Sequence, residues 1–334
     1  MMNRLALLVF LLLSGAGLQA QYAPQAGLAG STAVSATGGQ VQSWATGCVV
    51  KRGYLNIANP ALGRASAGDS SLAVGPADEF TVSLGDSGVA VLTFAHPIFD
   101  GQGPDFAVFE NGFRNDTDST QAFLELAFVE VSSDGFNYFR FPSASLTQTI
   151  TQIGNGDYLV ASNLDNLAGK YVAMYGTPFD LAELRGTEGL DVNNVTHVRI
   201  VDVVGAISGN GISYDHSGRM INDPYPTPFP TCGFDLDAVG VLNEMYESVK
   251  QLPGGLQISV YPVPADDQVF VSVSGAKSQE LHAVLTSLTG NCLGQYQLAQ
   301  SHNAIPLSGI PSGMYFLTIS DANGNQWTEK VIRR

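Results

Sequence analysis

Short segments that alternate between apolar and polar residues follow one another closely through the centre of the chain. Eight of them lie between residues 80 and 242, separated by polar or glycine-bearing connections. They read FTVSL, VAVLTFA, DFAVFE, LELAFVEVS, YFRF, KYVAMY, THVRIVDVV and DLDAVGVL. Short strands with such connections are typical of a jelly roll or a related β-sandwich. The sequence therefore predicts an all-β, jelly-roll-like central domain.

The composition agrees with this fold class. The 334 residues include 37 Gly and 16 Pro, and only 13% are charged, which favours a loop-rich β protein over a helical one. One short helical turn is predicted in GTPFDLAELRG. Thr177 is the expected cap, Pro178 the first helical residue and Gly186 the end, with Asp180 favouring the helix start.

The N-terminus has the pattern of a secretory signal peptide. Arg4 precedes an apolar run over residues 5–13, and small residues continue to Ala20. The run is too short for a stable membrane span. We therefore expect residues 1–20 to be removed, the mature chain to start near Gln21, and this chain to carry no transmembrane anchor.

A linker divides the rest of the chain into two unequal parts. Pro253, Gly254 and Gly255 interrupt residues 250–257, so we predict domains at 21–249 and 258–334. Residues 21–257 hold 25 acidic and 10 basic side chains, a balance of −15, whereas residues 258–334 hold 5 and 4, a balance of −1. An acidic domain is a poor partner for nucleic acid, whose binding depends on Lys and Arg.

The C-terminal segment has the alternation of a small antiparallel, immunoglobulin-like β-sandwich. The turn dipeptides Thr289-Gly290 and Asn323-Gly324 separate its apolar positions. These positions are Val269, Val271, Val273, Tyr315, Leu317 and Ile319.

Three motifs in this segment carry a family resemblance. Tyr261-Pro262-Val263-Pro264, Leu288-Thr289-Gly290 and Gly313-Met314-Tyr315-Phe316 occur in the order seen in the type A C-terminal sorting domain of the type IX secretion system, which residues 258–334 resemble. The family usually has Asn where Val263 stands and often Asp where Ser287 stands. The resemblance implies handling by the type IX machinery and a secreted or outer-membrane cell-surface location.

Acidic residues of the central domain occupy positions where a carboxylate needs a partner. Asp105, Glu110 and Asn111 flank one strand, and Glu130 and Asp202 continue the apolar faces of two others. A buried carboxylate requires either a cation or several hydrogen-bond donors. Basic residues are scarce in this domain, so a bound cation is the favoured partner.

A second acidic cluster lies on or beside the proline-rich loop near residue 224. Hard oxygen donors from several loops are typical of Ca²⁺ sites, although no EF-hand spacing is present. The alternative is that these acids lie at solvated strand ends and loops and bind nothing. The predicted metal set is Asp105, Glu110, Asn111, Glu130, Asp202, Asp215, Asp223, Asp235 and Asp237.

The central domain also resembles a known class of module. AFVEVSSDGFNYFRF and GFDLDAVGVL are similar to strands of discoidin-like, galactose-binding-type sandwiches of bacterial surface proteins. The resemblance implies a calcium near the sheet edge, at Asp105, Glu110, Asn111, Asp235 and Asp237, and binding of glycans or membranes through loops at one end.

Large aromatic residues in predicted loops are candidates for stacking on a sugar, with packing in the core or loops as the alternative. They are Trp44, Tyr214, Tyr225 and Phe229. In an oxidising compartment Cys48 and Cys232 can form a disulfide, which the sequence leaves open and which would leave Cys292 unpaired.

No recognisable catalytic motif is present. The sequence has no Gly-x-Ser-x-Gly elbow, phosphate loop or Cys/His nucleophile pair, and its five His residues are scattered. We therefore expect a calcium-stabilised surface binding protein for a glycan or a similar extracellular ligand, and no enzyme. The alternatives are a glycan hydrolase, which needs only two carboxylates, and an adhesive or structural surface protein.

Overall fold

The computed structural model describes residues 22–244, 250–251, 257–261, 263–274, 281–298 and 301–334. The predicted signal peptide lies outside this part of the chain. Strands dominate the described residues, with 3-10 turns at η1 (Pro60–Leu62), η2 (Ser70–Ala73), η3 (Ala161–Asn163) and η4 (Leu181–Leu184). The all-β prediction is confirmed. None of the described helical segments has the length and apolar character needed to cross a membrane.

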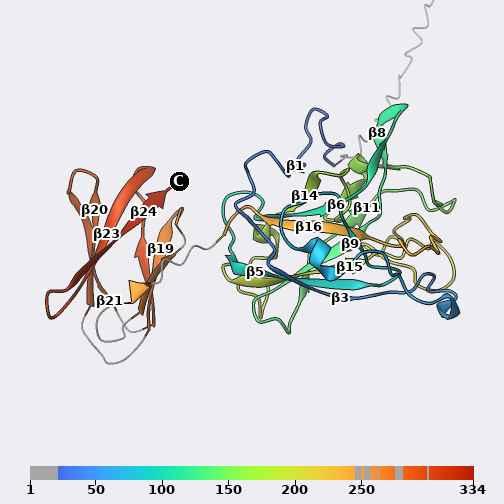
Figure 1. Ribbon diagram of the computed structural model, residues 1–334. Helices are drawn as coiled ribbons and strands as arrows, with labels where there is room; N and C mark the ends of the chain where they lie inside the picture. Colours follow the sequence, from blue (N-terminus) through green and yellow to red (C-terminus); the bar gives the residue numbers. More distant parts are fainter. Residues whose placement is uncertain (1–21, 245–249, 252–256, 262, 275–280, 299–300) are drawn as a thin grey trace, which may run out of the picture.

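Two antiparallel sheets form the central domain (Figure 1). The first runs in the order β1 (Val34–Ser35), β14 (Tyr175–Phe179), β6 (Phe106–Glu110), β16 (Asp235–Val241) and β2 (Ser43–Trp44), with β4 (Val82–Ser83) also paired to β16. The second runs in the order β10 (Phe139–Arg140), β9 (Ala127–Ser132), β15 (Val195–Asp202), β5 (Val89–Ile98) and β3 (Gly47–Lys51).

The chain order of these strands is that of a jelly roll. The four neighbours β4, β16, β6 and β14 form one sheet, and β5, β15, β9 and β10 form the other. Consecutive strands mostly alternate between the sheets, and the last strand β16 returns to pair with β4. The predicted jelly-roll-like sandwich is therefore confirmed.

The main core lies between the two sheets. Phe106 stacks on Phe179 with ring centroids 5.4 Å apart, and Phe141 packs against both. Strands β6, β9 and β16 are buried along their whole length, because smaller apolar clusters cover their outer faces as well. Each fully buried Phe contributes about 1.5–3 kcal/mol. The acids on these strands are consequently drawn into the interior.

Two small sheets extend the sandwich. One pairs β11 (Ala144–Ser145) with β13 (Leu164–Asp165), and the other has the order β12 (Leu159–Val160), β8 (Asp118–Phe123) and β7 (Phe113–Asn115). The β8 strand projects beyond the two main sheets (Figure 1). None of these short strands was predicted, because segments such as DSTQAF are mostly polar.

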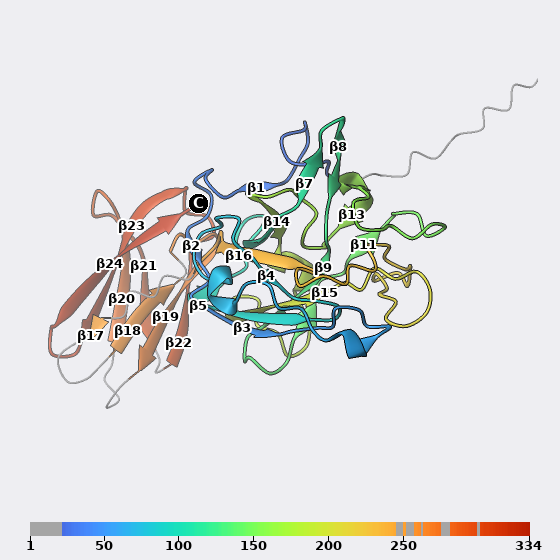
Figure 2. The same cartoon turned by 45° about the vertical axis from the view of Figure 1, so that its right-hand side comes forward.

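The C-terminal part is a separate antiparallel sandwich with its own core (Figure 2). One sheet has the order β17 (Lys250–Gln251), β18 (Gln257–Tyr261), β19 (Gln268–Ser274) and β22 (Ser301–Pro306). The other has the order β21 (Cys292–Leu298), β20 (Leu281–Ser287), β23 (Gly313–Asp321) and β24 (Gln326–Arg333). The predicted small sandwich is thus observed.

Three local predictions differ from the structure. The predicted linker begins with a strand, because Lys250 and Gln251 of β17 pair with Ile258 and Gln257. In KYVAMY only the final Tyr175 belongs to a strand, β14. This strand also contains Thr177 and Pro178, so the 3-10 turn η4 follows it, and Asp180 is the residue that caps η4.

Candidate metal centre

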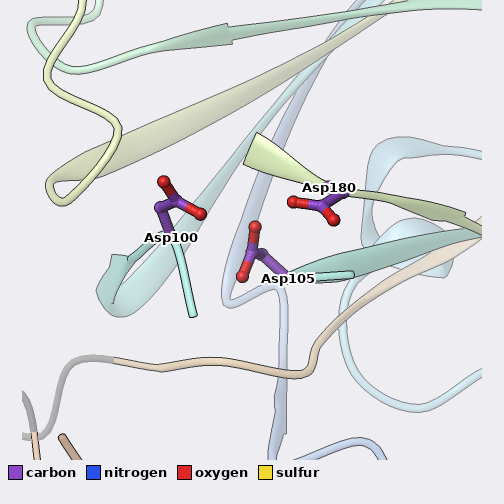
Figure 3. Close-up of side chains that lie close together, drawn as sticks. All are labelled: Asp100, Asp105 and Asp180. Atoms are coloured by element: carbon purple, nitrogen blue, oxygen red, sulfur yellow. The ribbon is translucent and has the colours of Figure 1, made fainter. Parts of the chain in front are cut away.

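The predicted calcium ligands do not form a single group. Asp105 directly precedes β6 and Glu110 ends it, so strand geometry separates them by about 16 Å. Among the described residues, one group brings three carboxylate oxygens within 4.8 Å of one another, and it consists of Asp100, Asp105 and Asp180. We call these three residues the aspartate triad. Figure 3 shows their carboxylates turned toward one another.

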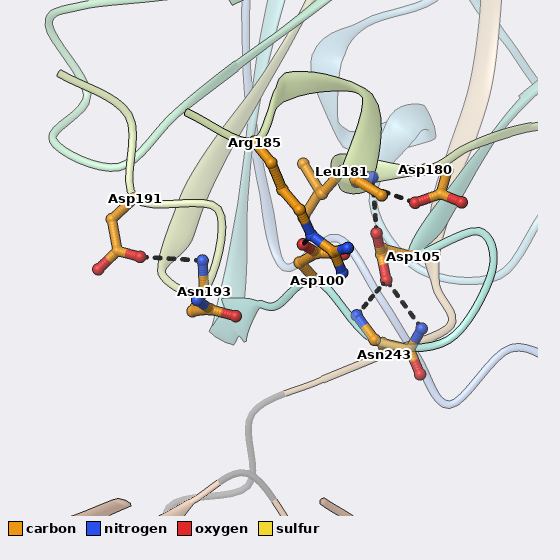
Figure 4. A network of polar contacts seen from close by, with 10 residues as sticks. Asp100, Asp105, Asp180, Leu181, Arg185, Asp191, Asn193 and Asn243 are labelled. Atoms are coloured by element: carbon orange, nitrogen blue, oxygen red, sulfur yellow. Dashed lines mark hydrogen bonds and ion pairs between the residues drawn. The ribbon is translucent and has the colours of Figure 1, made fainter. Parts of the chain in front are cut away.

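Asp105 is the fully buried member of the triad. Its Oδ1 accepts hydrogen bonds from the Gly101 N–H and the Asn243 side-chain amide, both at 2.8 Å, and its Oδ2 accepts from the Leu181 N–H at 2.7 Å (Figure 4). Burial raises the pKa of Asp105 to about 7, and the nearby charge of Asp100 acts in the same direction. Three hydrogen bonds therefore hold this carboxylate in place, but they do not fully offset the free-energy cost of burying its charge.

Asp100 and Asp180 complete the triad from β5 and β14. Asp100 follows β5, and its side chain is only 3% exposed. Its Oδ2 pairs with Arg185, which is 61% exposed, while its Oδ1 is buried without a hydrogen-bond partner in the described part of the chain. Asp180 follows β14 and caps η4 by accepting from the Ala182 N–H at 2.9 Å. A cavity of about 530 Å³ is lined by Asp180 and Arg185, together with Asp266 and Arg334 of the C-terminal sandwich.

A second set of acids lies toward the other end of β6 and in the neighbouring strands. This inner acidic group consists of Glu110, Glu125, Asp202, Asp223 and Asp235. Burial raises the pKa of every member, and neighbouring carboxylates raise the pKa of Glu110, Glu125, Asp202 and Asp223 further. Glu110 Oε1 and Asp223 Oδ1 are buried without a hydrogen-bond partner in the described chain. Such a group of buried carboxylates is stable when some of its members are protonated or when a cation is bound among them.

Some predicted ligands are brought together in this inner group. Asn111 donates to Asp235 at 3.2 Å, and Asp235 also accepts from Ser83. Asp237, on the same strand β16, instead accepts from the backbone N–H groups of Asp78 and Glu79 at 3.1 and 3.2 Å. The charges of Asp235 and Asp237 both raise the pKa of Glu110. The structure thus assembles part of the predicted set and leaves Asp105 apart from it.

Glu130 has protein cations in place of a metal. Arg140 binds its Oε1 at 2.8 Å, and Arg199 pairs with its Oε2. The argument that basic residues are too scarce was wrong here, because both arginines lie on the strands that flank β9.

Asp202 and Asp215 use backbone donors. Asp202 accepts from Ser87 and Phe234 at 2.9 and 2.7 Å. Asp215 accepts from three N–H groups of Ser145, Ser217 and Arg219.

The four predicted aromatic ligand residues differ in their surroundings. Trp44 packs against Phe109 with ring centroids 5.3 Å apart, and the Tyr225 hydroxyl donates to Asn56. Tyr214 and Phe229 are 52% and 47% exposed. Trp44 and Tyr225 thus have partners within the protein, and ligand binding by the set stays a prediction.

The candidate disulfide is not formed. Cys48, Cys232 and Cys292 are all free thiols. Cys48 lies on β3, and the Cys232 thiol donates to the Tyr54 carbonyl oxygen at 3.5 Å. Burial raises the pKa of the Cys48 thiol to about 11, which makes it a poor nucleophile at neutral pH.

Sequence reasoning missed Asp100, Asp180 and Glu125. Asp180 was interpreted only as a helix-start residue, and Asp100 follows an ordinary strand. Glu125 precedes Leu126 on the LELAFVEVS segment, in the position expected to face away from the apolar stripe. Only the complete sandwich shows that the second face is covered as well.

Comparison with known proteins identifies the C-terminal sandwich. Residues 259–334 match the family of secretion system C-terminal sorting domains. The expected type IX sorting domain is thereby confirmed, and the protein is secreted or attached to the cell surface. A search of curated proteins gives no match.

Solved structures that resemble this chain do so only weakly. A protein from Bacteroides vulgatus with an immunoglobulin-like β-sandwich fold has 13% identity and a TM-score of 0.22, covering 27% of this chain and 95% of its own. A β-glucuronidase from Ruminococcus gnavus in complex with uronic deoxynojirimycin has 13% identity and a TM-score of 0.21. The match covers 88% of this chain but 45% of that enzyme. Similarity this low carries no argument about activity.

Proposed function

We propose that this exported protein is a calcium-stabilised surface module that recognises an extracellular glycan. The observation that carries the calcium assignment is the convergence of the aspartate triad, together with the buried, unpartnered Oδ1 of Asp100. Three ionised carboxylates and the single charge of Arg185 leave a net charge of −2, which a divalent ion balances. Calcium takes carboxylate oxygens from separate segments at such spacings.

The choice of the triad over the inner acidic group rests on geometry. The triad oxygens lie within 4.8 Å of one another, close enough to contact one ion, whereas the inner group contains no such set of three among the described residues. Asp180 of the triad also lines a cavity, while Glu110 and Asp223 of the inner group are almost completely inaccessible.

Calcium-dependent melting of the full chain tests this assignment. An ion that binds only the folded protein stabilises it by about 2.7 kcal/mol at a concentration 100 times its Kd. We expect the melting temperature in Ca²⁺ to exceed that in chelator by several degrees. The increase should disappear in Asp100→Asn and persist in Asp116→Asn, because Asp116 is exposed and lies outside the triad.

Two results would contradict the calcium proposal. If chelation leaves the wild-type melting temperature unchanged, calcium does not stabilise the protein. If Asp100→Asn responds to calcium as fully as the wild type, the ion binds elsewhere, and the inner acidic group becomes the next site to test.

A glycan array on the full chain tests the recognition part of the proposal. The export signal and the exposed aromatic side chains of the central sandwich support it. We expect binding without release of sugar products. Turnover of a bound glycan would instead favour the hydrolase alternative, since paired carboxylates are abundant in this domain.

A further inference from the structure

A polar groove lies on the small sheet of the central sandwich, and neither the aspartate triad nor the inner acidic group lines it. It has a volume of about 650 Å³ and is formed by β8, β12 and the loop that joins β11 to β12. Gln121, Thr147, Gln148, Asp157, Tyr158 and Asn163 line it, together with apolar residues such as Leu146 and Leu159. Its size is in the range of small-ligand sites.

An exposed group of aromatic rings borders this groove. Phe113 on β7 stacks on Phe123 on β8 with ring centroids 5.2 Å apart and planes 15° apart. Tyr158, which lines the groove, meets Phe113 edge-on at 6.5 Å. Phe113 is 55% exposed and Tyr158 is 37% exposed. Aromatic faces left open beside polar groups match the two kinds of surface on a sugar ring.

One residue that lines the groove has a polar atom without a partner. Thr147 Oγ1 is buried and makes no hydrogen bond within the described part of the chain. A hydroxyl buried in this way costs roughly 1–3 kcal/mol unless a ligand or water supplies the missing bond. A sugar hydroxyl both donates and accepts, so it suits this position.

The groove carries little charge for a domain this acidic. Asp157 is the charged residue among those that line it, and its Oδ2 already accepts from the Gly154 N–H at 2.8 Å. The remaining polar groups are amides and hydroxyls. The groove therefore offers no countercharge to an acidic sugar.

We propose that this groove binds an uncharged oligosaccharide, with a sugar ring on Tyr158 and a sugar hydroxyl bonded to Thr147. The inference rests on the proposed glycan recognition and names its site and ligand class. It replaces the predicted aromatic set of Trp44, Tyr214, Tyr225 and Phe229 as the binding surface.

Titration calorimetry on the full chain tests the groove with four neutral probes: cellohexaose, laminarihexaose, xylohexaose and mannohexaose. We expect at least one to bind. Tyr158→Ala should then weaken its binding about tenfold or more, whereas Tyr158→Phe keeps the ring and should retain most of the affinity. The control is Phe136→Ala, which removes an exposed ring outside the groove and should leave binding unchanged.

Thr147→Val separates a ligand contact from a structural role. The change keeps the shape of the side chain and removes the unpartnered hydroxyl, so the melting temperature should stay level or rise while affinity falls about five- to tenfold. A fall in melting temperature without a loss of affinity would overturn the role of Thr147.

The remaining outcomes distinguish the groove from the broader proposal. If a neutral hexaose binds Tyr158→Ala as tightly as the wild type, the groove is wrong while glycan recognition stands. If the array shows binding to acidic glycans alone, the ligand class is wrong. If no glycan binds the wild type, glycan recognition itself fails, whatever the calcium response shows.

Discussion

Gly101 shows how one missing side chain shapes the aspartate triad. A Cβ at this position would lie 2.5 Å from the side-chain carbon of Asn243, whose amide donates to Asp105. Gly101 also supplies a backbone N–H to the same carboxylate. The residue therefore allows two of the three donors of Asp105 to approach together.

We predict that Gly101→Ala destabilises the protein by about 1–3 kcal/mol, because Asn243 must move and a buried carboxylate loses a donor. Urea unfolding measures the change. Gly154→Ala is the control, since its Cβ would meet its nearest neighbour at an ordinary 3.5 Å. Equal stability of the two variants would show that the approach of Asn243 is unimportant.

Glu130 provides the test of a protein-supplied counterion. We predict that Glu130→Gln lowers the free energy of unfolding by about 1–3 kcal/mol, because bonds to a charged acceptor are lost from Arg140 and Arg199. Denaturation in chelator and in Ca²⁺ should give the same loss. A loss that appears only with Ca²⁺ would restore Glu130 as a metal ligand.

For individual residues, the sequence predicted which acids are buried and need partners, but it did not predict which groups those partners are. Pleat parity correctly placed Glu130 and Asp202 inside. It could not show that register sets Arg140 and Arg199 opposite Glu130, or that a loop offers N–H groups to Asp202. Those partners come from segments far apart in the chain, and only pairing brings them together.

Asp86 and members of the inner acidic group make the stability of the central sandwich depend on pH. Burial raises the pKa of Asp86 to about 6, from an ordinary 3.8, and raises those of Glu110, Asp202 and Asp223 as well. Between the unfolded and folded pKa values the folded state binds more protons. Stability must therefore fall as pH rises from about 4 through about 6.

We predict that, in chelator, the free energy of unfolding is lower at about pH 6.5 than at about pH 4.5. These two pH values lie within the range in which the buried carboxyl groups titrate. Chemical denaturation at several pH values measures it. Asp86→Asn should flatten the slope, because its amide oxygen can still accept from the Ile57 N–H without ionising. A stability that rises with pH over this range would show that these carboxylates are compensated in the folded protein.

Among the elements, long apolar strands were the most predictable. The segments around β5, β6, β9, β15 and β16 were recognised from alternation and β-branched residues. The edges were less predictable, because β3, β7 and β8 are partly exposed and mix polar residues with apolar ones. The binding groove proposed above lies on one of these unrecognised edges.

The whole molecule contains two sandwiches whose cores share no residue. The main core of the central sandwich uses residues between Ala45 and Val241, and that of the tail uses residues between Ile258 and Val331. Composition and charge predicted a division at the Pro-Gly-Gly segment, which lies outside the described residues. The exact boundary was not predictable, because the pairing of β17 with β18 depends on the fold of the tail.

We predict that a chain ending at residue 249 keeps the cooperative melting of the central sandwich, with its melting temperature within a few degrees of the full protein. Its main core and both main sheets contain no residue of the tail. Calorimetry of the two forms measures the difference. Loss of the cooperative transition would mean that the tail is needed for the central fold.

The pairing of β4 with β16 governs when this protein can fold. Ser83 bonds Asp235, a residue 152 positions later, and the sheet edge formed by β4 has no other strand partner among the described residues. When the chain is made from its N-terminus, β4 is present long before β16. Contacts of such long range slow folding, and the sandwich can close only once nearly the whole central domain is available.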